Sequence, residues 1–137
     1  MNALFHAHSG LRYLVLLAAL VAIVALGYAL ATGRRVRTAQ RLATAFTALL
    51  DLQIVLGFGL VFGGLFPDAV IGHLALMLLG AIVVHATSYF GRQAESERRE
   101  LGIRLAGIVI SLALIVGGIL AIGRSVLGTA PPTMPIH

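Results

Sequence analysis

The sequence predicts an all-α integral membrane protein, folded as an antiparallel up-down bundle of four transmembrane helices. Hydrophobic residues make up 59% of the 137 residues and charged residues only 11%, against roughly 45–50% and 25% in soluble domains. So few charges cannot cover the surface of a soluble domain, and a disordered chain would need low hydrophobicity and high charge. Four long apolar segments, separated by arginine-rich connections, complete the argument for a membrane bundle.

Each apolar segment is close to the roughly 20 residues that a helix needs to cross the hydrocarbon core of a bilayer. The segments cover residues 11–31, 42–66, 69–90 and 101–122. The first resembles a signal peptide, because Ala29-Leu30-Ala31 looks like a cleavage site. Its apolar run is too long for that, however, and it lacks a compact basic start. We therefore expect it to be a membrane span.

The later segments have recognisable ends. Pro67 and Asp68 suit the first turn of the third helix, since proline is tolerated at the first helical position and an acidic side chain is favourable there. Residues 129–137 contain three prolines, so we expect a flexible tail. Residues 1–128 then form one transmembrane domain, and short connections favour antiparallel neighbours.

The arginines predict the orientation of the bundle. Eight of the ten basic residues lie between spans one and two or between spans three and four: Arg34, Arg35, Arg37, Arg41, Arg92, Arg98, Arg99 and Arg104. The positive-inside rule makes this side cytoplasmic, and both termini then lie on the non-cytoplasmic side. The net charge of +5 is therefore interpreted as a topology signal and not as a nucleic-acid surface.

Ionisable residues inside a membrane are costly, so each is a candidate functional residue. His8 lies near the outer start of the first span, and His73 lies about one and a half turns inside the third. The two should share a depth on different helices, as the axial ligands of a b-type haem do. Arg12, one turn below His8, and Arg124, from the fourth span, are then candidates to pair with haem propionates.

Glycines are frequent in the same outer half of the bundle. The second span carries Gly57, Gly59, Gly63 and Gly64, the third Gly80, and the fourth Gly117, Gly118 and Gly123. They could make room for a macrocycle between helices. Small residues also allow close helix contact, and Gly59 and Gly63 have the spacing typical of such packing, so the sequence leaves both interpretations open.

His6 offers a different metal site. Residues two apart on a helix are rotated by about 200°, so His6 and His8 face the same way only if the chain is extended there. In that case His6, His8, His73 and Asp68 could hold a bare zinc or copper ion.

Asp51 and His85 form a second, inner layer. Asp51 lies ten residues after Arg41, and His85 lies seven residues before Arg92, so the two are at similar depth. The pair could relay protons, His85 could ligate a second haem, or the two side chains could simply connect two helices. The sequence lacks the motifs of other catalytic or cofactor sites. It has no cysteine, and it has no phosphate loop, nucleophile elbow or HExxH motif.

Three segments carry a resemblance to a known family. The motif His-Ser-Gly-Leu-Arg at residues 8–12, the segment Leu52–Gly57, and His73 followed by Met77 resemble small four-helix bacterial membrane proteins that are loosely described as cytochrome b-like. The resemblance implies that His8 and His73 are the ligand pair. Where that family has a histidine before the glutamine of the second span, this chain has Asp51, so no second-span ligand is implied.

These observations predict a b-type haem protein of the bacterial inner membrane that relays electrons as a subunit or partner of a respiratory or photosynthetic complex. The apolar segments leave no room for a soluble substrate domain, so a relay or accessory subunit is expected rather than a complete enzyme. Two alternatives stay open. One is a structural accessory subunit that packs against other membrane proteins or copies of itself, and the other is a proton-conducting or transport bundle built on Asp51 and His85.

Overall fold

The structure is a computed structural model that describes residues 2–64, 69–123 and 125–127. It contains four helices, with no strand in these ranges: α1 Asn2–Thr32, α2 Val36–Phe62, α3 Ala69–Arg92 and α4 Glu97–Ala121. All four are long and apolar enough to cross a membrane. The prediction of an all-helical bundle with four membrane-spanning helices is confirmed in these terms. The predicted features at Pro67, Asp68 and residues 129–137 lie outside the described residues.

Three helices begin earlier than the apolar segments predicted. α1 begins at Asn2 rather than at residue 11, α2 at Val36 rather than at residue 42, and α4 at Glu97 rather than at residue 101. Hydropathy marks the part of a helix that suits lipid, whereas the backbone hydrogen bonds of a helix continue into polar sequence. At about 1.5 Å per residue, the 31 residues of α1 extend about 46 Å, beyond a hydrocarbon core of about 30 Å.

The start of α4 is set by a side-chain cap. The Ser96 hydroxyl oxygen accepts a hydrogen bond from the backbone N–H of Arg99 at 3.3 Å, and Glu97 and Glu100 lie in the first turn. Acidic side chains are favourable there because the N-terminus of a helix carries partial positive charge. The helix therefore begins where its first backbone N–H groups find partners.

A Ser96→Ala variant is expected to lower the free energy of unfolding by about 1 kcal/mol, because the first turn of α4 loses a capping acceptor. Unfolding by SDS titration in detergent micelles measures this. Thr38→Ala in the first turn of α2 is the control, since Thr38 is exposed and is not the cap of that helix. An equal loss in both variants would contradict the capping role.

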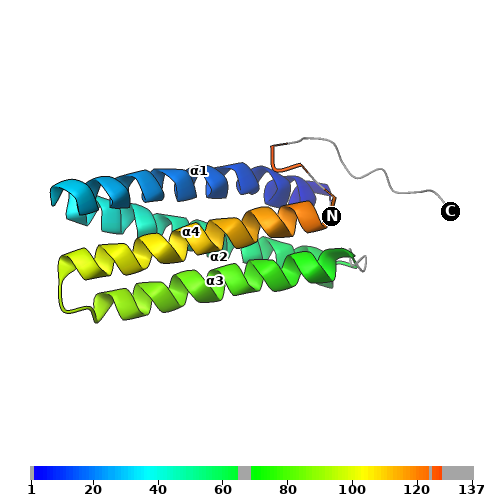
Figure 1. Ribbon diagram of the computed structural model, residues 1–137. Coiled ribbons are helices and arrows are strands. Elements are labelled where there is room, and N and C mark those ends of the chain that lie inside the picture. The colour runs from blue at the N-terminus through cyan, green and yellow to red at the C-terminus, as the bar shows by residue number, and fades with distance from the viewer. Residues whose placement is uncertain (1, 65–68, 124, 128–137) are drawn as a thin grey trace.

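The helices pack as two hairpins (Figure 1). α1 packs along α2 and α3 along α4, α1 also contacts α4, and contact between α2 and α3 is sparse. The short α1–α2 and α3–α4 connections lie at the same end of the bundle. In the first of these, Gly33 and Arg35 take left-handed conformations, with φ of 66° and 58°, which lets three residues reverse the chain.

Small residues bring α3 and α4 close together. A Cβ added to Gly107 would overlap the side chain of Thr87, and one added to Gly80 would lie 3.2 Å from Oγ of Ser111. Small residues at helix contacts of this kind are typical of membrane bundles.

The hydrophobic core side chains that are completely buried are Ala19, Ala22 and Leu26 on α1 and Phe46 and Leu50 on α2.

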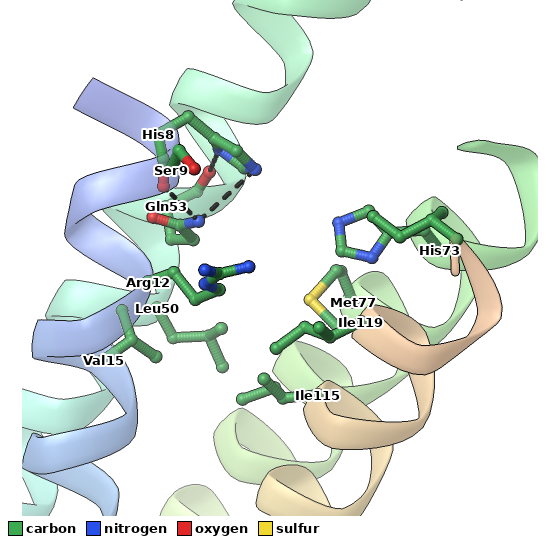
Figure 2. Close-up of a pocket in the computed structure, with 11 residues that line it drawn as sticks. His8, Ser9, Arg12, Val15, Leu50, Gln53, His73, Met77, Ile115 and Ile119 are labelled. Atoms are coloured by element: carbon green, nitrogen blue, oxygen red, sulfur yellow. Dashed lines mark hydrogen bonds between the residues drawn. The ribbon is translucent and has the colours of Figure 1, made fainter. Parts of the chain in front are cut away.

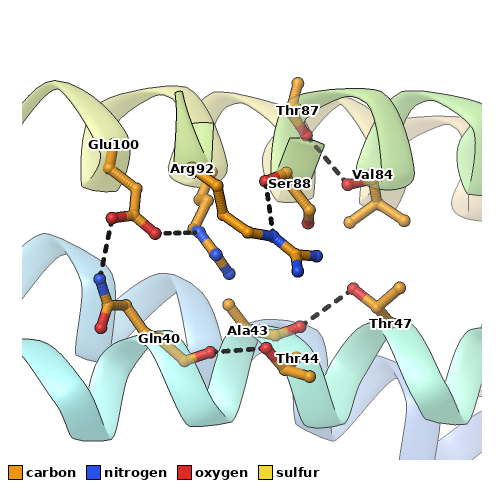
Figure 3. Close-up of polar contacts among 10 residues, drawn as sticks. Gln40, Ala43, Thr44, Thr47, Val84, Thr87, Ser88, Arg92 and Glu100 are labelled. Carbon is orange, nitrogen blue, oxygen red and sulfur yellow. Dashed lines mark hydrogen bonds and ion pairs between the residues drawn. The ribbon is translucent and has the colours of Figure 1, made fainter. Parts of the chain in front are cut away.

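One ion pair lies inside the bundle near the arginine-rich end (Figure 3). Nε of Arg104 lies 2.9 Å from Oε1 of Glu100, and Gln40 of α2 donates from Nε2 to Oε2 of Glu100 at 3.0 Å. Arg104, assigned above to the arginines between spans, is buried within α4. That assignment was wrong, because Arg104 already falls inside the predicted span 101–122, and in the structure it connects α4 to α2 through Glu100.

Candidate functional site

A pocket lies between the two hairpins, toward the end of the bundle opposite the arginine-rich connections (Figure 2). It encloses about 40 Å³. All four helices contribute to it, and its floor is apolar. Its lining consists of His8, Ser9, Arg12, Val15, Leu50, Gln53, His73, Met77, Ile115, Ile119 and Ile122.

His8 enters the pocket from α1 and is held by α2. Its Nδ1 lies 3.1 Å from the backbone oxygen of Gln53, and a carbonyl only accepts, so Nδ1 carries the proton in the neutral ring. The lone pair is then on Nε2, where the Gln53 side-chain Nε2 donates at 3.3 Å. The same amide nitrogen donates to the backbone oxygen of His8 at 2.9 Å. Gln53 therefore sets both the tautomer and the orientation of His8.

His73 enters from α3 on the other side of the pocket and is held by α4. Its Nδ1 donates to the backbone oxygen of Gly118 at 2.9 Å, so the lone pair of the neutral ring again lies on Nε2. Figure 2 shows the ring turned toward the α1–α2 side of the pocket. The glycine gives the ring room, because a Cβ on Gly118 would lie 3.3 Å from His73 Nδ1 and 2.7 Å from Cε of Met77.

The structure thus brings His8 and His73 into one pocket from different hairpins, with the same pattern of hydrogen bonds. Each ring donates from Nδ1 to a backbone carbonyl of the neighbouring helix. Histidines that bind metals usually have this second hydrogen bond, which orients the ring and leaves Nε2 for the metal. The arrangement can therefore present two nitrogen ligands from opposite walls.

Arg12 lies one turn below His8, as its spacing predicts, and lines the same pocket. Its side chain is buried, and its guanidinium group extends into the space between the hairpins (Figure 2). Nη2 donates to the hydroxyl of Tyr13 at 2.7 Å, and Cζ lies 4.6 Å from the centre of the Tyr13 ring. The pocket therefore contains a positive charge between its two histidines. Arg124, the other candidate partner of a propionate, lies outside the described residues.

Several glycines of the outer half lie against neighbouring side chains and so leave no preformed space for a macrocycle. A Cβ on Gly57 would lie 3.2 Å from Cε1 of His8, and one on Gly59 would lie 3.1 Å from Cδ2 of Leu4. Gly80 packs against Ser111 and does not line the pocket. Gly57 and Gly118 admit the histidine rings themselves, so these glycines serve close packing.

The bare-metal alternative with His6 does not form among the described residues. α1 begins at Asn2, so the chain is helical at both His6 and His8, and His6 is exposed. No group of three or more potential metal-ligating His, Asp or Glu side chains occurs in the part of the chain that the structure describes. Asp68, the fourth member of that predicted set, lies outside it.

Asp51 and His85 do pair, but they do not face the pocket. His85 Nε2 lies 2.9 Å from Oδ1 of Asp51, and the side chains are 55% and 46% exposed, respectively. The pair connects α2 to α3 on the outside of the bundle. Depth along the chain placed the two residues at a similar level and left their pairing open, whereas the side of each helix could be seen only in the packed structure.

Gln53 is the site residue whose role was missed in the sequence. It is buried and holds His8 through both its backbone and its side chain. A signal was present, since a glutamine within an apolar span is itself costly unless it is hydrogen-bonded. It was overlooked because only ionisable side chains were treated as candidates.

No family model, curated protein or solved structure matches the chain.

Proposed function

We propose that this protein is a membrane-embedded b-type haem protein that relays electrons, with His8 and His73 as the axial ligands. One observation carries the proposal: two imidazoles from different hairpins enter the same pocket, each donating from Nδ1 to a backbone carbonyl. That arrangement puts the lone pair of each neutral ring on Nε2, the atom that would bind iron. The resemblance of residues 8–12, and of His73 followed by Met77, to cytochrome b-like membrane proteins implies the same pair.

The number of ligands favours haem over a bare metal ion. Structural zinc takes four ligands and catalytic zinc usually three, whereas the pocket offers two histidines and no larger ligating group among the described residues. In haem, the macrocycle supplies the four equatorial nitrogens, so two protein ligands suffice. A bound haem would supply one-electron chemistry.

The two histidines fit haem as ligands, but the enclosed space is too small for it. The two hairpins would have to separate to admit a haem. Cofactor pockets enclose roughly 300–1,000 Å³, against about 40 Å³ here. Arg12 and Met77 line the pocket between the histidines (Figure 2), so both side chains would move aside. The amide of Gln53 would also release Nε2 of His8, while its hydrogen bond to the backbone of His8 can remain. The sparse contact between α2 and α3 makes that side the easier one to open, while α1 can stay packed against α4.

Arg12 would bind a propionate. Its guanidinium matches a carboxylate with two parallel hydrogen bonds, and it already lies in the pocket. With the arginine-rich end on the cytoplasmic side, the bundle would be an antiparallel one with both termini on the non-cytoplasmic side. The haem would then lie in the outer half of the bacterial inner membrane, suited to a subunit or partner of a respiratory or photosynthetic complex.

The test is a reduced-minus-oxidised absorption spectrum of the purified protein, produced in a host that supplies haem. We expect an α-band in the b-haem region and one haem per chain by pyridine haemochromogen assay. The absence of an α-band in protein whose circular dichroism shows intact helices would refute the proposal.

A structural accessory subunit is the second candidate, favoured by one observation. Both histidines already have partners within the protein, Gln53 and Gly118, and the enclosed space is small. In that case the site ties the two hairpins together. A His73→Ala variant with unchanged cofactor content and a weakened complex with partner subunits would favour this function.

A further inference from the structure

The Asp51–His85 pair lies where an isolated bundle would expose it to lipid. Asp51 is near the middle of α2 and His85 lies within α3, and about half of each side chain is exposed. Ionisable side chains in membrane helices almost always face protein or water, because hydrocarbon cannot solvate them. Something other than lipid should therefore cover this face.

Exposed apolar side chains flank the pair on both helices. Val55, one turn from Asp51 on α2, is 65% exposed, and Ile82, nearly one turn from His85 on α3, is 63% exposed. α2 and α3 contact each other sparsely. Together they present a face of the bundle with one acid and one base at its centre. We refer to this face, defined by Asp51, Val55, Ile82 and His85, as the α2–α3 face.

We propose that a second copy of this chain covers the α2–α3 face, forming a two-fold symmetric dimer. The charges make the face complementary to itself. Two copies inserted with the same orientation are related by an axis along the helices, so residues at equal depth meet. Asp51 of each copy can then pair with His85 of the other. The two intramolecular pairs become a closed ring of four side chains, with the apolar residues Val55 and Ile82 packed around it.

Other partners would leave the Asp51–His85 pair with fewer hydrogen bonds. A purely apolar partner helix would leave the outer atoms of Asp51 and His85 without hydrogen bonds, and lipid tails would do the same. The proposal does not depend on haem, and its readout is association between copies. Its failure is therefore distinguishable from a failure of the proposed function.

The test compares Asp51→Asn and His85→Gln copies, alone and mixed, by energy transfer in liposomes. Because the chain has no cysteine, a single Gln93→Cys substitution in the α3–α4 connection carries the fluorophore. Either variant alone loses every acid–base pair between copies. A mixed dimer keeps one, from Asp51 of the His85→Gln copy to His85 of the Asp51→Asn copy. We expect each variant alone to associate about tenfold more weakly than the wild type, and the mixture to recover part of that loss.

A second comparison leaves the ion pair intact. Ile82→Ala on the α2–α3 face should weaken association roughly threefold or more through lost packing. Leu17→Ala is the control on α1, at a position that is 56% exposed near the helix centre, and it should leave association unchanged. A wild-type protein that stays monomeric, a mixture no stronger than either variant alone, or equal effects of Ile82→Ala and Leu17→Ala would each overturn the proposal. Circular dichroism confirms that each variant is folded.

Discussion

Replacing either His8 or His73 by alanine is expected to abolish stoichiometric haem binding. In the proposed site each ring would supply one of two nitrogen ligands to the iron, and the other described residues that line the pocket include no imidazole. Haem held by one histidine loses half of its axial ligation, so we expect the α-band of the reduced spectrum to disappear or to shift to that of a high-spin species. The measurement is the reduced-minus-oxidised spectrum together with the haem content of each purified variant.

Two other histidines are matched controls for this prediction. His6 lies two residues from His8 on α1 but is exposed, and His85 lies on α3 with His73 but pairs with Asp51 outside the pocket. His6→Ala and His85→Ala should therefore keep both the spectrum and the haem content of the wild type. Full haem content in His8→Ala or His73→Ala, or its loss in the controls, would show that the ligands are assigned incorrectly.

A Gly107→Ala variant is expected to lower the free energy of unfolding by about 3 kcal/mol, the upper range of typical overpacking effects. The new Cβ would overlap the Thr87 side chain, lying 2.6 Å from its Cβ. Thr87 cannot easily turn away, because Oγ1 donates to the backbone oxygen of Val83 at 2.8 Å. α3 and α4 would have to move apart at this contact. SDS titration in micelles measures the change.

Gly102→Ala in the same helix is the control, since a Cβ there would meet no atom within 4 Å. It should be neutral or slightly stabilising, because alanine favours a helix over glycine by about 1 kcal/mol. A double variant that combines Gly107→Ala with Thr87→Ala removes part of the overlap and should recover part of the stability. If Gly107→Ala were as stable as Gly102→Ala, the close approach of α3 and α4 at this point would be wrong.

The membrane class and the four helices could be predicted because they depend on composition and on segment length. A run of about 20 apolar residues is costly to expose to water wherever it lies in the chain. The ends of the helices were less predictable. The start of α4 at Glu97 depends on the Ser96 cap, and the start of α1 at Asn2 lies in sequence whose hydropathy carries no signal.

The sequence could predict the depth of each site residue along its helix, but not the direction in which its side chain points. His8 and His73 were expected at one level because depth follows from counting residues along a helix, and both line the pocket. The same counting placed Asp51 and His85 together, and they pair at 2.9 Å. It could not show that this second pair lies outside the bundle, nor that Gln53, two residues after Asp51, points inward to hold His8.

The reason is that these helices are apolar almost all round. In a soluble protein, a polar stripe shows which side of a helix faces water, but in a membrane the lipid-facing and buried sides have nearly the same composition. Residue types and spacing therefore determined that there are four spans and how deep each polar group lies. The rotation of each helix was decided by tertiary contacts such as Gly107 against Thr87 and Gly118 against His73. Those contacts turn two histidines inward to the pocket and leave Asp51 and His85 exposed on the α2–α3 face.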